Sequence, residues 1–134
     1  MAVEASTTGI LLFAHGSVVE EANQSVHDLA SQVQALGGYR YVRAAFLDVA
    51  HPDLEEAVGQ AVRAGIRRVV VIPFFLTMGI HLQRDLPALI APLKQRYPEL
   101  ELEVGQSLEG HPLMPEIILS RIRGAAESSR VSEA

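Results

Sequence analysis

Residues 69–87 combine a continuous apolar run, an apolar loop with one histidine, and the start of an amphipathic helical pattern, in that order. The β-branched residues that open this segment are typical of a parallel strand buried on both faces. Pro73 has no backbone N–H to donate to a sheet, so regular pairing should weaken there. Gly79 permits a turn before His81. In open α/β sheets a loop of this kind lies at the carboxyl end of a strand, where ligands bind.

The same order of strand, loop and helix recurs along the whole sequence. Apolar patterning predicts strands at residues 9–13, 41–47, 69–73 and 100–106, and helices at 21–36, 54–64, 84–96 and 114–123. The last strand alternates apolar and acidic residues, as a less buried edge strand does. This pattern predicts a single α/β domain with a four-stranded parallel sheet and helices on both faces. The predicted domain covers 9–123, between an N-terminal arm at 1–8 and a flexible C-terminal tail at 124–134.

The composition narrows the classes of function that fit this chain. Its 134 residues suit one domain, and a hydrophobic content of 49% suffices for a core. The formal net charge of -5 disfavours a general nucleic-acid binder or a protein of anionic membranes. Because the chain contains no cysteine, a transition metal would bind through nitrogen and oxygen ligands. The sequence shows neither a signal peptide nor an apolar run of membrane-spanning length, so we expect a cytoplasmic protein.

Each predicted strand is followed by a loop with a polar side chain that can bind a metal or transfer a proton. These side chains are His15, Asp48 with His51, His81, and His111. Parallel strands place their carboxyl ends on one rim of the sheet, so we expect the side chains to converge. Imidazoles with a carboxylate suit a divalent ion such as Co, Ni, Fe or Zn, and also proton transfer near neutral pH.

Structural roles remain open for some of these residues. His51 precedes a proline at a predicted helix start, where capping or solvent exposure is more common than ligation. Asp48 is also a typical turn residue. Gly16 and Ser17 offer backbone donors to an anion, although Gly-Ser alone is a weak signal. The apolar residues around His81 suit a protein core, a flat apolar ligand or a subunit partner.

Three blocks of this sequence resemble the sirohydrochlorin chelatases of the short CbiX type. They are LLFAHGS at 11–17, AFLDVAHPDL at 45–54 and VIPFFLTMGIHLQRDLP at 71–87, and the similarity extends from about residue 10 to residue 122. The resemblance implies a class II chelatase, which inserts a divalent metal into a tetrapyrrole without ATP. It also implies a flavodoxin-like, or chelatase-like, fold. Larger relatives carry two such domains with the active site between them, so a single-domain chain implies a homodimer.

The resemblance also assigns roles to individual positions. His15 and His81 match the family's two metal-binding and proton-accepting histidines, and Asp48 stands where relatives usually have a longer glutamate. Basic side chains are needed for the carboxylates of the substrate, with Arg84 as the nearest candidate and Arg43 as a second. The full set of implied substrate contacts is Gly16, Ser17, Phe75, Leu76, Thr77, Met78, Gly79, Ile80, Arg84 and His111.

The implied function is insertion of a divalent metal into sirohydrochlorin, with Co²⁺ favoured over Fe²⁺ and Ni²⁺. Neither ATP, another cofactor, a nucleic acid nor a membrane is implied. A non-catalytic module that binds and delivers a tetrapyrrole or metal would use the same residues. A third reading is phosphoryl transfer through His15, because His-Gly after a first strand is similar to the histidine phosphatases. Those enzymes place an arginine just before the histidine, where this chain has Ala14.

Overall fold

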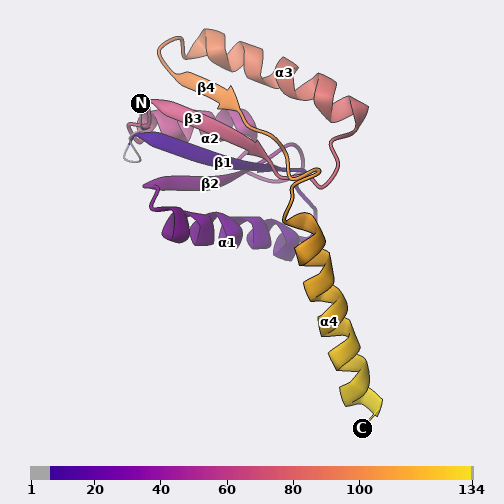
Figure 1. Cartoon of the computed structure of the whole chain (residues 1–134). Coiled ribbons are helices and arrows are strands. Elements are labelled where there is room, and N and C mark those ends of the chain that lie inside the picture. The colour runs from indigo at the N-terminus through magenta and orange to yellow at the C-terminus, as the bar shows by residue number, and fades with distance from the viewer. Residues whose placement is uncertain (1–6, 134) are drawn as a thin grey trace.

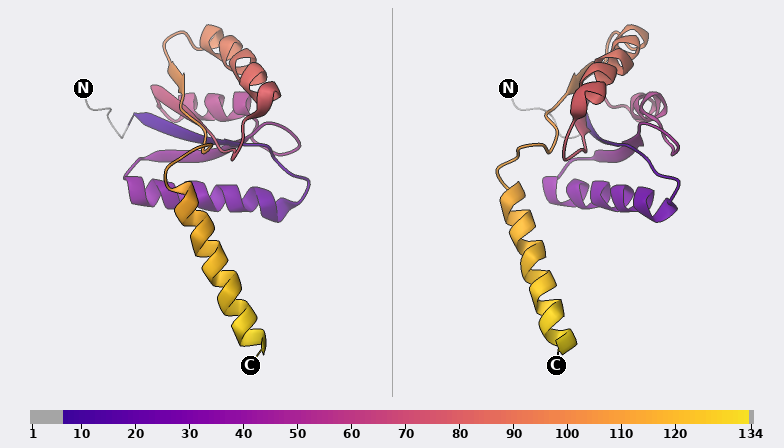
Figure 2. Two further views of the ribbon diagram at one scale, coloured as in Figure 1. Left: turned by 45° about the vertical axis from the view of Figure 1, so that its right-hand side comes forward. Right: turned by 90° about the vertical axis from the view of Figure 1, so that its right-hand side faces the viewer.

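The computed structural model describes residues 7–133 as one four-stranded parallel sheet with four helices (Figure 1). The elements are β1 (Thr8–Ala14), α1 (Glu20–Gly37), β2 (Tyr41–Phe46), α2 (Leu54–Arg63), β3 (Arg68–Pro73), α3 (Gly79–Arg96), β4 (Glu101–Val104) and α4 (Met114–Glu133). The strand order is β2-β1-β3-β4, and all three neighbouring pairs are parallel. Helix α1 lies on one face of the sheet, and α2 and α3 lie on the other (Figures 1 and 2). The predicted single α/β domain with helices on both faces is therefore confirmed.

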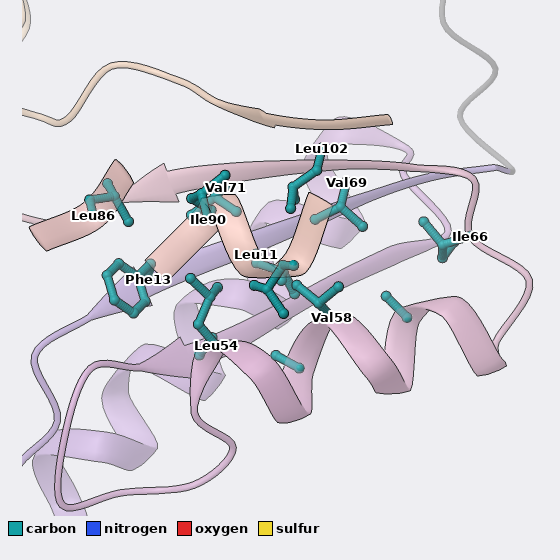
Figure 3. Close-up of a cluster of buried hydrophobic side chains, with 14 of the residues drawn as sticks. Leu11, Phe13, Leu54, Val58, Ile66, Val69, Val71, Leu86, Ile90 and Leu102 are labelled. Atoms are coloured by element: carbon teal, nitrogen blue, oxygen red, sulfur yellow. The ribbon is translucent and has the colours of Figure 1, made fainter. Parts of the chain in front are cut away.

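The larger hydrophobic core lies between the sheet and helices α2 and α3 (Figure 3). Strand residues Leu11, Val69 and Val71 are fully buried there, and Val58 of α2 and Ile90 of α3 pack against them. Complete burial of an aliphatic side chain of this size contributes about 1.5–3 kcal/mol. The strand order reverses between β1 and β3, so the loops after these two strands border the crevice in which α/β sheets bind ligands.

The two faces of β3 differ in burial. Val69 and Val71 are 0% exposed, whereas Val70 and Ile72 on the opposite face are only half-buried. The prediction that this strand is buried on both faces was therefore wrong for the second face. The physical reason is that α1 lies over β1 and β2, leaving this side of β3 and β4 partly open. The prediction of an edge strand at β4 is confirmed, and β3 ends at Pro73 as expected.

Helix α3 begins earlier than the sequence pattern predicted. It starts at Gly79 rather than Arg84, so His81 lies in its first turn and not in the preceding loop. Gly79 has a φ of 67°, a conformation that glycine adopts without strain and that lets the chain turn directly into the helix. Pro87, which resembled a helix-start residue, lies inside the helix on its exposed side, as does Pro92.

The ends of the predicted domain also differ from the structure. Residues 1–6 of the predicted arm lie outside the described residues, and Thr8 already belongs to β1. Helix α4 continues past the predicted end at Arg123 to Glu133, so residues 124–133 of the predicted flexible tail belong to this helix. Gly124 does not end the helix, because the two alanines and the glutamate that follow it favour helical backbone.

Candidate functional site

His15 stands directly after β1 at the carboxyl rim of the sheet. Its imidazole is exposed and meets the ring of Phe75 edge to face, with ring centroids 4.7 Å apart. Phe75 is 6% exposed and meets Phe13 of the core at 6.0 Å. A buried aromatic side chain from the loop after β3 thus supports the histidine that follows β1.

The loops after β1 and β2 are joined through Gly16. The N–H of Asp48 donates to the carbonyl of His15 at 3.0 Å, which continues the pairing of the two strands into their loops. Gly16 has a φ of 87°, and a Cβ at this position would lie 2.0 Å from the carbonyl oxygen of Asp48. Only glycine fits this approach, so Gly16 has a clear backbone role in holding Asp48 beside His15.

The buried side chain of Asn23 in α1 fixes the next residue of the first loop. Its Oδ1 accepts a hydrogen bond from the Ser17 N–H at 2.9 Å, and its Nδ2 donates to the Ser17 carbonyl at 2.8 Å. The Ser17 hydroxyl itself accepts from the N–H of Val19 at 3.0 Å. Sequence reasoning missed Asn23. The available signal was a polar residue at the buried helical spacing of Val26 and Ala30.

His81 lies exposed in the first turn of α3, close to a contact between two further loops. Met78, the residue before this helix, donates its N–H to Oε2 of Glu109 at 3.2 Å. Glu109 belongs to the loop after β4, and a carboxylate at a helix N-terminus is favoured by the helix dipole. Sequence reasoning missed Glu109, because no local pattern links it to α3.

One carboxylate oxygen of Asp48 forms a hydrogen bond within its own loop. Its Oδ1 accepts a hydrogen bond from the N–H of Val49 at 2.8 Å, which fits the turn role left open by the sequence. His15, Asp48 and His81 are all exposed. Within residues 7–133, no group of three or more His, Asp or Glu side chains is arranged to hold a metal ion.

The two remaining loop histidines make local contacts. Nδ1 of His111 accepts from the N–H of Leu113 at 3.1 Å, just before α4. His51 contacts Glu56 at 2.8 Å, beside the capping box that Asp53 and Glu56 form at the start of α2. The hydrogen bond with Glu56 raises the pKa of His51 above its ordinary value of 6.5. Of the two common roles for a histidine at this position, solvent exposure describes His51, whereas Asp53 is the residue that caps α2.

The rim also exposes aliphatic side chains from all four loops. Of the predicted apolar contacts, Leu76 and Ile80 are exposed, whereas Phe75 is buried and Met78 is half-buried. Thr77 and Gly79 are exposed between them. The other loops add exposed side chains that sequence reasoning missed: Val18, Val19, Val49 and Leu113. This combination of apolar side chains and imidazoles suits a flat ligand with an apolar face.

The two arginine candidates differ in position. Arg84 is exposed on α3, one turn after His81. Arg43 lies within β2, where it stacks over Tyr41 at 4.3 Å and donates to Gln34 at 3.0 Å. Arg43 is therefore engaged away from the rim, and the expectation that it serves as a rim contact was wrong.

Comparison with known proteins identifies relatives of this chain. A sirohydrochlorin cobaltochelatase of Methanopyrus kandleri is 33% identical over 81 residues, which are 60% of this chain and 57% of the relative. A chloroplastic sirohydrochlorin ferrochelatase of Arabidopsis thaliana is 30% identical over 115 residues, which are 86% of this chain and 51% of the relative. The matched segments thus span little more than half of the length of these relatives.

Solved structures share the fold. A CbiX protein from Marinobacter aquaeolei VT8 matches with a TM-score of 0.79 and 25% identity, over 92% of this chain and 98% of that one. Sirohydrochlorin chelatase SirB from Bacillus subtilis subspecies spizizenii, in complex with cobalt, matches with a TM-score of 0.69 and 27% identity, over 75% and 43% of the two chains. The model of the CbiX family matches residues 9–125. The chain therefore belongs to the CbiX family.

Proposed function

We propose that this protein is an enzyme that inserts a divalent metal ion into sirohydrochlorin without ATP. Co²⁺ is the favoured metal, with Fe²⁺ and Ni²⁺ as alternatives. The observation that carries the proposal is the exposed imidazole of His15, held on the buried ring of Phe75 at the rim of a CbiX-family fold. The relatives named as cobaltochelatase and ferrochelatase support the substrate class.

The chemistry assigns distinct tasks to the rim residues. The free-base macrocycle loses two pyrrole protons as the metal enters. Neutral imidazoles of His15 and His81 would hold the incoming ion and accept these protons, and Asp48 would offset its positive charge. Two imidazoles leave further coordination positions for the nitrogens of the macrocycle. A proton and a metal ion compete for the same imidazole nitrogen, so the insertion rate should fall in acid.

The remaining rim side chains would bind the substrate. Leu76 and Ile80 would pack on the face of the macrocycle, with Thr77, Met78 and Gly79 completing that loop. Arg84 would pair with a peripheral carboxylate. Gly16 and Ser17 would position the first loop, and the second ring nitrogen of His111 would face the substrate.

We further propose that the protein acts as a cytoplasmic homodimer. The cobalt complex of SirB is matched over 43% of its chain, and a second structure, SirB from Bacillus subtilis with Fe³⁺, over 40%, so those proteins are more than twice as long as the matched segment. A second copy of this chain would complete the substrate site. None of the described helices combines the length and apolar content that a membrane crossing requires.

The decisive experiment measures metal insertion into sirohydrochlorin with Co²⁺, Fe²⁺ and Ni²⁺ in parallel, followed by visible absorption. His15→Ala and His81→Ala should each lower the rate by about 100-fold or more, the usual contribution of a proton-transfer group. His51→Ala is a matched control, because His51 is an exposed loop histidine that pairs with Glu56 instead. Full activity of the His81→Ala variant would refute the assignment.

The same assay separates catalysis from delivery. An enzyme present at one hundredth of the substrate concentration converts all of it. A delivery module would yield at most one metallated product for each binding site.

A further inference from the structure

Helix α4 exposes an apolar face to solvent. It projects away from the sheet and the other helices in all three views (Figures 1 and 2), and residues 115–128 are all exposed. Ile117, Ile118 and Ile122 are 50%, 53% and 56% exposed. Ile118, Ile122 and Ala125 follow the i, i+4, i+7 spacing of one helix face, while Ser120 lies on the opposite side. An amphipathic helix gains most of its stability by burying its apolar face, so we expect this face of α4 to pack against another surface.

The sheet of the same chain carries a surface of the complementary kind. Val70 and Ile72 are half-buried on the face of β3 that α1 leaves open. A helix that follows the last strand of an α/β sheet ordinarily returns to cover such a face. Here α4 points away instead. A single copy therefore exposes both the apolar face of α4 and the face of β3 that such a helix would cover.

We propose that two copies of this chain exchange helix α4, each helix packing on the open face of β3 and β4 in the other copy. This inference rests on the homodimer proposed above and specifies its contact surface. Exchange of an identical element lets two copies satisfy surfaces that each copy leaves open. Helix α4 starts after the loop with His111, beside the carboxyl ends of the strands (Figure 1), so the exchange would bring the two rims close together.

The size and charge of the two surfaces agree with this arrangement. A helix of 20 residues is about 30 Å long and 10 Å wide, which gives a footprint of roughly 300 Å². Counted on both surfaces of two symmetric contacts, the exchange buries roughly 1,200 Å², the lower bound for a specific interface. Arg121 flanks the apolar stripe and exposed Glu101 flanks the open face, where Glu103 is already paired with Arg68. The polar side of α4 carries both acidic and basic residues, and together with the net charge of -5 this disfavours an anionic lipid surface as the partner.

The experiment uses single-cysteine variants. The chain contains no cysteine of its own, so each variant reacts only at the introduced residue. Protein with Ile122→Cys is mixed with protein carrying Val70→Cys and treated with a short bismaleimide crosslinker. We expect a crosslinked pair of two different chains. Ser120→Cys, on the polar side of α4, replaces Ile122→Cys in the control and should give at least tenfold less product. In parallel, sedimentation measures the mass of the wild type, of Ile118→Glu and of the control Ser120→Glu, with circular dichroism to verify folding.

Exchange predicts a dimeric wild type, a dimeric Ser120→Glu control and a monomeric but folded Ile118→Glu variant. A dimer without the Val70 crosslink would overturn the exchange and leave the homodimer intact. A monomeric wild type would overturn both proposals. In a chain that carries both cysteines, a crosslink that forms only within that chain would overturn the exchange and leave the homodimer intact. Crosslinked dimer that fails to metallate sirohydrochlorin would count against the chelatase function alone.

Discussion

Replacement of Asn23 by alanine tests how the first loop is held. The side chain is 4% exposed and makes two hydrogen bonds, at 2.9 and 2.8 Å, with the backbone of Ser17. Asn23→Ala removes both and leaves a backbone donor and acceptor without these partners, each worth about 1–3 kcal/mol when buried. Because water reaches part of this loop, we expect a loss near the lower end, about 2–3 kcal/mol. For a domain of this size the melting temperature should fall by roughly 6–15 °C.

Urea denaturation followed by circular dichroism measures this loss. Gln24→Ala is the matched control, because the neighbouring Gln24 is exposed and donates its side-chain hydrogen bond to Asp28, at 2.9 Å, rather than to the loop. The control should cost no more than about 0.5 kcal/mol. Asn23→Asp keeps the acceptor for the Ser17 N–H but loses the donor to the carbonyl, so it should also destabilise the protein. If Asn23→Ala and Gln24→Ala cost the same, the side chain does not anchor the loop.

Two further predictions concern the rim. Gly16→Ala should lower the free energy of unfolding, measured in urea, by about 3 kcal/mol or more, because strain at positive φ adds to the clash with the neighbouring loop. Gly38 also has a positive φ but open space around it, so Gly38→Ala should cost only about 1–2 kcal/mol. Equal costs would argue against the close approach at Gly16. Because the pKa of His51 is raised, its contact with Glu56 stabilises the fold below pH 6.5, and this stabilisation is lost as the pH rises through the raised pKa. Because the pKa of Glu56 is lowered, the contribution of this carboxylate is lost at the acid end, as the pH falls and Glu56 becomes protonated. NMR titration should show the pKa of His51 falling in Glu56→Gln, and an unchanged value would contradict the assignment.

The local patterns of the sequence predict most of the fold. Strand–helix alternation identifies the parallel sheet, and the aspartate before α2 identifies its cap, because both depend on residues close in sequence. The predicted start of α3 was wrong because Gly79 resembles a turn residue and Pro87 resembles a helix start. In the structure Gly79 is itself the first residue of the helix. The open face of β3 could not be predicted, because a continuous apolar run does not reveal how many helices cover it.

The candidate site is predictable only in part, for the same reason. A histidine directly after a buried strand is visible in the sequence, so His15 is an easy candidate. Its support by Phe75 depends on which loops meet in space, and the same holds for the contact between Met78 and Glu109. These long-range contacts decide how the rim is held together, and none of them leaves a periodic signal.

The short edge strand β4 limits how copies of this protein can associate. It contains four residues, and Glu101 and Glu103 project from one side of it. Glu103 is paired with Arg68 of β3, but two such edges placed next to each other would still bring the Glu101 carboxylates of two copies together, which opposes continuation of the sheet from one molecule to the next. Edge strands that lack such protection are the usual starting point for fibrils. The acidic residues of β4 therefore protect a chain with exposed apolar surface from open-ended growth.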